Sequence, residues 1–160
     1  MLHALQAELL SRLLAQSPAS FEQAIIDLLI AMGYGGSEGE SARRLGGAGD
    51  GGVDGVIDED RLGLDRIYIQ AKRYASGTSV GRPELQAFVG SLVGFAATKG
   101  VFVTTSTFSC QAIDYVKNLQ HRIVLIDGQR MAELMVEYRV GVRVSRIVEI
   151  KSLDENFFDN

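Results

Sequence analysis

The stretch VDGVIDEDRLGLDRIYIQAK, residues 53–72, contains the pattern that decides the fold. Residues 53–58 alternate apolar and polar side chains, residues 66–72 do so again, and the polar segment between them is rich in turn-forming residues. Alternation with a period of two is typical of a half-buried strand, because successive side chains point to opposite faces of a sheet. The stretch therefore predicts two antiparallel strands joined as a hairpin.

A glycine-rich loop, GGAGDGG at residues 46–52, leads into the first strand. Its glycines at 47, 49 and 52 have the spacing of a dinucleotide-binding loop, but such a loop lies between a strand and a helix. A strand pattern follows here, which disfavours a dinucleotide site. Two interpretations remain: a simple turn, or a loop that brings a carboxylate to a metal ion.

The rest of the chain predicts alternating helices and strands. Leucine spacing indicates a helix over 3–15, and Ser17 with Pro18 is typical of the start of a second helix that ends at Gly33. Further expected helices cover 83–99, 108–120 and 129–140, with strands over 100–105 and 122–127, a short strand near 42–45 and an edge strand over 142–150. Two apolar strands around one helix favour an α/β fold with a mixed sheet.

Length and composition limit the class of protein. With 160 residues, 46% of them hydrophobic, the chain fits one globular domain. Its apolar runs are shorter than the ~20 residues of a membrane span, and its first residues do not resemble a secretory signal, so we expect a cytoplasmic protein. The net charge of −4 argues against bulk electrostatic coating of nucleic acid, although three of the acidic residues fall within 154–159.

The metal-binding residue types are few. Cys110 is the single cysteine, and His3 and His121 are far apart in sequence. An internal disulfide and a cysteine-rich zinc site are therefore excluded, and any metal ion must be bound mainly by oxygen. Oxygen ligands suit hard cations such as Mg²⁺, Mn²⁺ or Ca²⁺.

Three polar residues of the hairpin form a candidate catalytic cluster. Gln70 and Lys72 are two apart on one strand and share a face, and a hairpin closed at 58–65 can place Asp54 beside them. Asp54 and Gln70 could bind a divalent cation through oxygen, and Lys72 could orient water or stabilise negative charge in a transition state. The spacing alone also fits a surface strand with ordinary polar residues.

Several segments together resemble the Mrr-type restriction endonucleases. GDGGVDGVI followed by IYIQAKRY carries the resemblance, and FEQAIIDLLIAMGYGG at 21–36, LGL at 62–64, KGVFVTTSTFS at 99–109 and LIDGQRMAELMVEYRVGV at 125–142 extend it over most of the chain. That family has the PD-(D/E)xK nuclease-like fold, in which helices flank a mixed sheet in an αβββαβ order. The resemblance implies this restriction-endonuclease-like α/β fold, in agreement with the strand and helix patterns.

The resemblance also implies roles for individual residues. By position, Asp54 is the first metal ligand, Gln70 stands where most related nucleases have an acidic residue, and Lys72 is the lysine of the motif. Glu22 matches a helix glutamate that helps to bind metal, which could offset the charge that Gln70 lacks. The role of Asp50 stays open: it could support the ligands by hydrogen bonding, stabilise the loop through bonds to backbone amides, or be an alternative ligand, and we favour the first two.

A set of basic residues could hold DNA phosphates. Its members are Arg43, Arg44, Arg73, Arg82 and Lys99. For each of them alone, a solvated surface role is the competing interpretation.

Taken with the site, the resemblance implies a Mg²⁺-dependent DNA endonuclease of the type IV, modified-DNA restriction kind, with Mn²⁺ as a substitute. Its expected partners are double-stranded DNA, methylated DNA included, and a second copy in a homodimer or larger oligomer. The alternatives are a Holliday-junction or repair nuclease on the same fold and a catalytically silent DNA-binding module. We expect one nuclease domain over 1–160, with an N-terminal helix at 1–16, a core at 17–142 and an extension at 143–160; the family's preceding winged-helix domain is expected to be absent.

Overall fold

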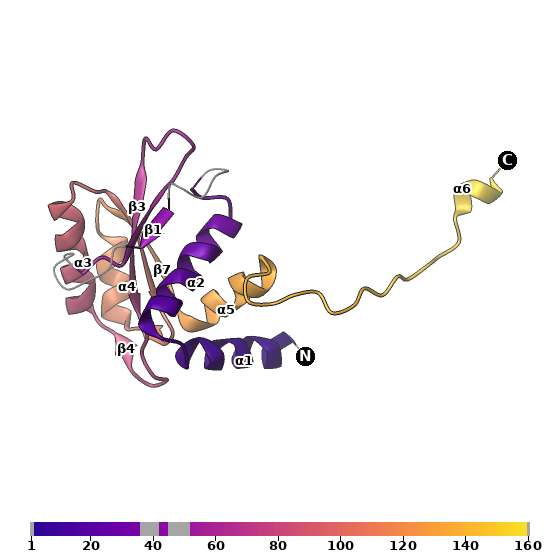
Figure 1. Ribbon diagram of the computed structural model, residues 1–160, viewed down its shortest axis with the longest axis horizontal. Coiled ribbons are helices and arrows are strands. Elements are labelled where there is room, and N and C mark those ends of the chain that lie inside the picture. Colours follow the sequence, from indigo (N-terminus) through magenta and orange to yellow (C-terminus); the bar gives the residue numbers. More distant parts are fainter. Residues whose placement is uncertain (1, 36–41, 45–51, 160) are drawn as a thin grey trace.

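A mixed β-sheet lies at the centre of the fold, with helices on both faces (Figure 1). The computed structural model describes residues 2–35, 42–44 and 52–159, and of residues 42–44 it describes the backbone alone. Within these ranges the main sheet has five strands in the order β1-β2-β3-β5-β7. Their bounds are Ala42–Arg44, Gly55–Asp58, Arg66–Lys72, Lys99–Thr104 and Arg122–Ile126.

The predicted hairpin is confirmed. Strands β2 and β3 are antiparallel, with Gly55 opposite Ile69 and Asp58 opposite Arg66. The short strand expected near 42–45 is also present, as β1 antiparallel to β2. Strands β5 and β7 continue the sheet in parallel with β3, so the sheet is mixed as expected.

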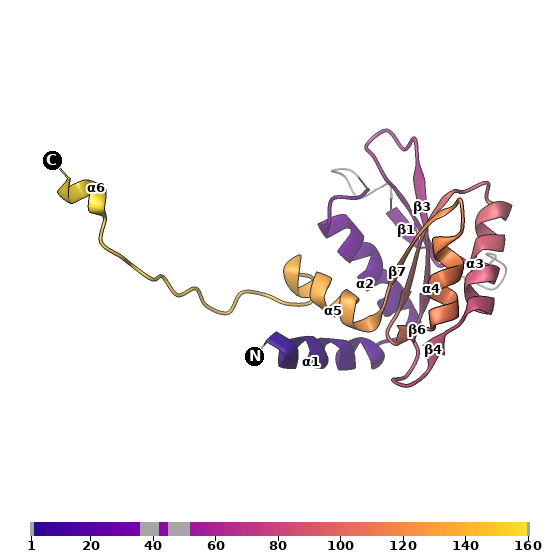
Figure 2. The same ribbon diagram turned by 180° about the vertical axis from the view of Figure 1, so that it is seen from behind.

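Different helices cover the two faces of the sheet (Figures 1 and 2). Helices α1 (Leu2–Leu14), α2 (Pro18–Ala31) and α5 (Gly128–Glu137) lie on one face, and α3 (Arg82–Gly94) and α4 (Cys110–Lys117) on the other. The first face encloses a core that includes Phe21, Ile25, Ile57, Ile69, Val103 and Met131. The second encloses a core that includes Val53, Leu85, Phe88, Phe102 and Ala112.

Local sequence signals explain where three helices begin. The side chain of Ser17 accepts a hydrogen bond from the Ser20 amide, with Pro18 next along the chain, so the predicted cap of α2 is confirmed. Ser109 and Asp127 cap α4 and α5 in the same way. Oxygen side chains at these positions satisfy amides that have no partner within the helix.

Three sequence predictions differ from the structure. The helix expected over 83–99 ends at Gly94, because Ala96 adopts a left-handed conformation with φ of 54° and Lys99 already belongs to β5. A short parallel pair, β4 (Ser79–Val80) and β6 (Thr107–Phe108), was not predicted. The edge strand expected over 142–150 is not formed, since those residues are extended without strand pairing.

Residues 143–159, here called the C-terminal arm, leave the domain after α5. The arm runs outward as an extended segment and ends in the short helix α6 (Glu155–Phe158) (Figures 1 and 2). Most of its apolar side chains are exposed, with Ile150 at 95%. Among the described helices of the chain, none is long and apolar enough to cross a membrane.

Candidate active site

Asp54 stands directly before β2 and is held by the neighbouring strand. Its backbone amide donates to the carbonyl oxygen of Ile69 at 2.8 Å, and its Oδ2 atom accepts from the amide of Ala71 at 2.7 Å. Burial raises the pKa of the Asp54 carboxyl, while the Ala71 amide and the charge of Lys72 act in the opposite direction. The structure therefore holds a half-buried carboxylate beside the end of β3, within electrostatic reach of Lys72.

Gln70 is a buried polar residue next to this carboxylate, with 9% of its surface exposed. Gly55 and Ile69 are the last paired residues of β2 and β3 at this end of the hairpin. Gln70 follows Ile69 and Asp54 precedes Gly55, so Gln70 lies opposite Asp54. Gly52 is close by: a methyl group added at Gly52 would lie 3.6 Å from Nε2 of Gln70 and 3.7 Å from Oγ of Ser91 on α3. Gly52 also has φ of 78°, so a glycine here both allows the turn and leaves space around the Gln70 amide.

Lys72 ends β3 on the same face as Gln70, because the two residues are two apart on one strand. The backbone at Lys72 is fixed from β5: its carbonyl oxygen accepts from Oγ1 of Thr104 at 2.8 Å and from the amide of Thr105 at 3.3 Å. Thr105 in turn donates from Oγ1 to the carbonyl oxygen of Tyr74 at 2.7 Å. Two buried threonines thus fix the chain on both sides of Arg73.

Sequence reasoning did not assign a role to this threonine pair. Thr104 and Thr105 are buried polar residues, and Ser106, which follows them, donates from its hydroxyl to the carbonyl of Thr78. The available signal was a run of four hydroxyl residues, 104–107, directly after the apolar segment GVFV. Hydroxyl groups at the end of a buried strand are expected to find partners, because an unpaired buried hydroxyl is costly.

Glu22 lies on a different element, in the first half of α2, with its side chain half-buried. The guanidinium of Arg73, the residue after Lys72, donates to the carbonyl of Gln16 directly before α2 begins. Beyond the other end of α2, the backbone amide of Gly35 donates to the carbonyl oxygen of Asp58, the last residue of β2. Helix α2 therefore starts at the end of the sheet that carries Lys72, which places Glu22 at the same end.

Two of the predicted DNA-binding arginines have partners within the chain. Nη1 of Arg73 donates to the carbonyls of Leu14, at 3.1 Å, and Gln16, so this side chain joins the end of α1 to the end of β3. Arg82 begins α3 and lies over the ring of Tyr115, with 5.2 Å between the guanidinium carbon and the ring centroid. Both side chains are exposed enough to meet solvent.

Lys99 is distant from the candidate cluster of Asp54, Gln70 and Lys72. It begins β5 opposite Ile67, at the other end of the sheet, and its ammonium pairs with Glu59 and, at 3.2 Å, with Asp65. These carboxylates raise the pKa of Lys99. The predicted positions Arg43, Arg44 and Asp50 lie outside what the structure describes, apart from the backbone of the two arginines in β1.

The donors gathered here fit a hard divalent cation. In the Asp54 carboxylate, Oδ2 accepts from the Ala71 amide and Oδ1 is the second oxygen donor. Gln70 contributes an amide carbonyl. Both are oxygen donors of the kind that Mg²⁺, Mn²⁺ and Ca²⁺ prefer. Within residues 2–35 and 52–159 no group of three His, Cys, Asp or Glu side chains converges on one point.

Solved structures share this arrangement of sheet and helices. The DNA modification-dependent restriction endonuclease AspBHI superimposes with a TM-score of 0.67 and 22% identity, over 88% of this chain and 36% of AspBHI. The MspJI restriction endonuclease, solved in complex with a 27-mer oligonucleotide, gives a TM-score of 0.59 and 26% identity, over 81% of this chain and 31% of MspJI. The fold therefore belongs to the restriction-endonuclease-like class, in which helices flank a mixed sheet.

Sequence comparison gives the family within this class. The restriction endonuclease family of the Mrr catalytic type matches residues 13–135. The chain is also 48% identical over 152 residues to the type IV methyl-directed restriction enzyme EcoKMrr of Escherichia coli (strain K12). That match covers 95% of this chain and 48% of the relative, so the chain spans about half the length of this curated relative. The chain belongs to the Mrr-type restriction endonuclease family.

Proposed function

We propose that this chain hydrolyses phosphodiester bonds in double-stranded DNA with the help of Mg²⁺. The observation that supports it most directly is the hydrogen bond from the Ala71 amide to Asp54, which holds a carboxylate beside the strand that carries Gln70 and Lys72. A carboxylate, an amide oxygen and an ammonium at one end of a sheet are the groups that metal-assisted phosphodiester hydrolysis needs.

Three residues of the chain would hold the metal ion in this proposal. Asp54 and Gln70 supply oxygen donors from the hairpin, and Glu22 supplies a carboxylate from α2. When bound, Mg²⁺ or its substitute Mn²⁺ would polarise the phosphate and increase the acidity of a water molecule. Glu22 would also supply negative charge that an acidic residue at position 70 would otherwise provide.

Lys72 has the second role in the proposed chemistry. Its backbone is fixed by Thr104 and Thr105, so the ammonium starts from a well-defined position at the end of β3. From there it can orient the attacking water and stabilise the negative charge that develops on the phosphate oxygens. A positioned ammonium does this better than a mobile one, because the reorganisation has already occurred in the folded protein.

The proposed substrate and assembly follow from the relative and from the reaction. EcoKMrr is described as methyl-directed, and we extend this to propose methylated DNA as a substrate of this chain. Cutting both strands at one place needs two opposed sites, so a homodimer on DNA is part of the proposal. Arg82 and the arginines at 43 and 44 are proposed phosphate contacts.

Plasmid cleavage tests the proposal. Wild type, Asp54→Ala and Lys72→Ala are incubated with methylated supercoiled plasmid in the presence of Mg²⁺ or EDTA. Two matched controls remove the same chemical groups from the exposed face of α4, as Asp114→Ala and Lys117→Ala. We expect cleavage by wild type and both controls with Mg²⁺, and loss of cleavage with EDTA or in either site variant.

Other outcomes discriminate between the alternatives. DNA binding without metal-dependent cleavage would instead favour a silent DNA-binding module. Strong preference for a four-way junction over linear DNA would favour a junction nuclease. Normal cleavage by a folded Asp54→Ala variant would contradict the assignment of the site.

A further inference from the structure

The outer edge of β7 is open to another strand. In the described part of the chain β7 is the last strand of the main sheet, and it pairs with β5 alone. The backbone groups on its outer side therefore have no ladder partner among the described strands. Such an edge is a template for an added strand, because each amide and carbonyl that points outward can bond to an extended chain.

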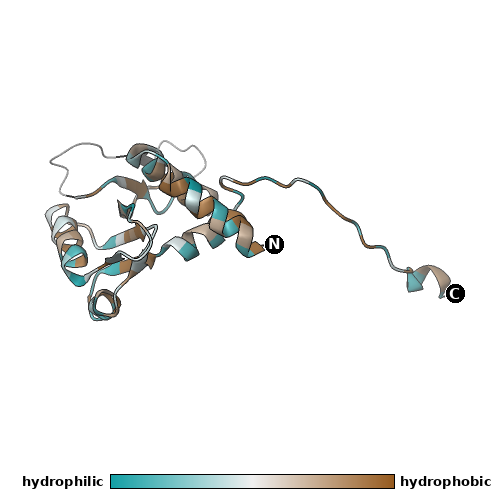
Figure 3. Cartoon of the chain, turned by 90° about the horizontal axis from the view of Figure 1, so that it is seen from below, coloured by the Kyte–Doolittle hydropathy of each residue, from teal (hydrophilic) through white to brown (hydrophobic). Residues whose placement is uncertain are grey.

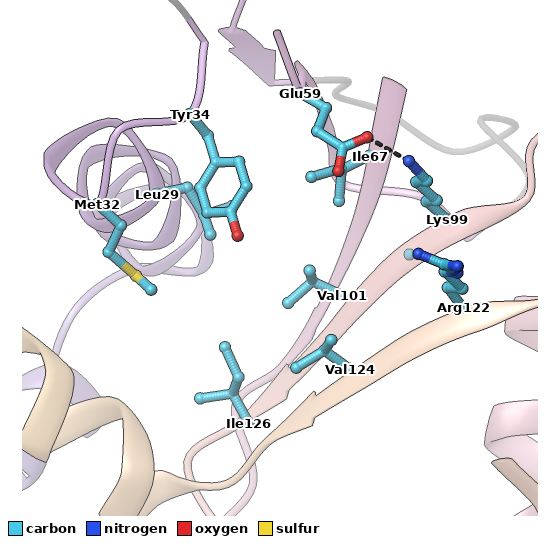
Figure 4. Close-up of a pocket in the computed structure, with 11 residues that line it drawn as sticks. Leu29, Met32, Tyr34, Glu59, Ile67, Lys99, Val101, Arg122, Val124 and Ile126 are labelled. Carbon is cyan, nitrogen blue, oxygen red and sulfur yellow. Dashed lines mark hydrogen bonds and ion pairs between the residues drawn. The ribbon is translucent and has the colours of Figure 1, made fainter. Parts of the chain in front are cut away.

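An apolar hollow of about 200 Å³ lies beside this edge (Figure 4). The strands contribute Val101, Val124 and Ile126 to its floor, and Leu29, Met32 and Tyr34 of the α2 region form the opposite wall. Val124, on β7 itself, is 56% exposed although it faces the same side of the sheet as the buried Ile126. The helices on this face thus leave the β7 end of the sheet only partly covered.

The C-terminal arm has the complementary properties. Residues 148–151 (Val, Glu, Ile, Lys) alternate apolar and polar side chains, which is the pattern of a strand with one apolar face, whereas Arg146 and Ile147 just before them break the alternation. Figure 3 shows both hydrophobic (brown) and hydrophilic (teal) segments along the arm. In the structure the arm makes no strand pair, and Val148 and Ile150 are 73% and 95% exposed. Apolar side chains so exposed favour burial against another surface.

We propose that the arm of one copy adds a strand to the β7 edge of a second copy and places Val148 and Ile150 against the apolar hollow. Main-chain hydrogen bonds to β7 would provide affinity, and the hollow would select the apolar face of the arm. The acidic residues 154, 155 and 159 would complement Arg122 at the rim of the hollow. The inference rests on the sheet edge and the arm, and it does not depend on the cleavage chemistry.

Length and direction favour a second copy as the partner. The arm leaves from α5 and runs away from its own domain in both views (Figures 1 and 2). Residues 143–153 could extend over about 35 Å, whereas the five residues of β7 span about 17 Å. About half of the arm is therefore enough to cover β7, and the remainder can cross between copies. Exchange of two arms about a two-fold axis would form two such contacts.

Sedimentation of the full chain without DNA is the first test. We expect wild type to dimerise in a concentration-dependent way, and Val148→Asp and Ile150→Asp each to weaken the dimer at least tenfold, because each removes a buried apolar side chain and buries a charge. Ser145→Asp puts the same charge on the polar face of the arm and should leave the dimer unchanged. Since the arm is exposed in the single chain, all three variants should keep wild-type thermal stability when monomeric. An equal dimerisation constant for wild type and Ile150→Asp would overturn the proposal.

Disulfide trapping is the second test, and it identifies which copy supplies the arm. In a Cys110→Ser background, Val124→Cys and Ile150→Cys are made on separate chains with different tags, mixed and oxidised. A covalent dimer that contains one chain of each kind is expected, and Ser145→Cys should replace Ile150→Cys poorly. A chain carrying both cysteines that closes onto itself, with no mixed dimer, would show that the arm folds back on its own domain and would overturn the proposal.

Discussion

Oδ2 of Asp54 accepts a hydrogen bond of 2.7 Å from the backbone amide of Ala71, the residue between Gln70 and Lys72. This hydrogen bond holds the carboxylate beside β3, the strand that carries Gln70 and Lys72. One oxygen is fixed by this bond, and the other can serve a ligand. Because the donor is a backbone amide, its position is set by the strand, and the hydrogen bond restricts the rotamer of the Asp54 side chain.

Asp54→Asn and Asp54→Ala should separate the structural and chemical roles of this residue. Asparagine keeps an oxygen acceptor for the Ala71 amide but removes the charge, so we expect stability near wild type and loss of cleavage. Alanine also leaves a partly buried amide without its acceptor, which should cost about 1 kcal/mol in unfolding free energy. Urea denaturation and plasmid cleavage measure the two effects. Equal loss of stability in both variants would contradict the structural role of this hydrogen bond.

Changes at Gln70 should alter metal affinity in opposite directions. Gln70→Glu adds a carboxylate at a buried position and should bind Mg²⁺ more tightly, whereas Gln70→Ala should bind it more weakly. Without metal, the buried glutamate should lower the melting temperature, because its charge is poorly solvated. Titration of the melting temperature with Mg²⁺ checks this, and equal responses of wild type and Gln70→Ala would remove Gln70 from the ligand set.

Thr104→Val should damage the position of Lys72 without touching a metal ligand. Valine keeps the shape but removes the hydroxyl that donates to the Lys72 carbonyl and accepts from the Ser106 amide. We expect a loss of about 1–3 kcal/mol in stability and a lower cleavage rate at unchanged Mg²⁺ affinity. Thr107→Val, at an exposed position on β6, is the matched control. Wild-type kcat in a folded Thr104→Val protein would argue against the positioning role.

Alanine substitution should lower the unfolding free energy at Gly128 and raise it at Gly90. A methyl group at Gly128 would overlap the backbone carbonyl of Thr105, which cannot rotate away, so Gly128→Ala should lose about 1–3 kcal/mol of stability or more. At Gly90 in α3 a methyl group meets nothing within 4 Å, and Gly90→Ala should gain about 0.5–1 kcal/mol. Chemical denaturation of both variants measures the difference. A neutral Gly128→Ala would mean that α5 can move away from Thr105.

Salt dependence should distinguish two arginines. Arg73 donates to the carbonyls at the end of α1, so Arg73→Ala should reduce stability by about 1 kcal/mol and leave the salt dependence of DNA binding unchanged. Arg82→Ala should lower the slope of log affinity against log salt by about one, as expected for loss of one phosphate contact. Binding is measured across a salt series with catalytically inactive protein. The reverse result would assign the phosphate contact to Arg73.

Local patterns were sufficient for much of the fold and for the proximity of Asp54 to the strand that carries Gln70 and Lys72. The hairpin was predictable because alternation at 53–58 and 66–72 reports one buried face on each strand. The start of α2 was predictable because Ser17 and Pro18 act within one turn. From the hairpin alone it followed that Asp54, Gln70 and Lys72 would lie together.

Contacts between distant segments were not predictable in this way. The threonine pair at 104 and 105 acts on carbonyls about 31 residues earlier in the chain, and nothing local signals that pairing. Arg73 donates to the carbonyls of Leu14, the last residue of α1, and Gln16, both more than 50 residues earlier in the chain, and no local pattern signals that contact. The DNA contact expected of Arg73 stays a prediction. The edge strand predicted over 142–150 was wrong, because a strand pattern does not specify whether a neighbouring strand is available to pair with it.

The turn between β2 and β3 has a consequence for the order of folding. The side chain of Asp60 accepts from the amides of Leu62 and Leu64, so the turn is stabilised by residues within a few positions of one another. Hairpins of this kind close in about 1–10 μs, and Asp54 and Ala71, 17 residues apart, can meet as soon as this one closes. Thr104, 32 residues beyond Lys72, reaches its partner only after α3 and β5 are in place. We therefore expect Asp60→Ala to slow folding and Thr104→Val mainly to speed unfolding, so that the carboxylate reaches its strand first and the lysine is fixed last.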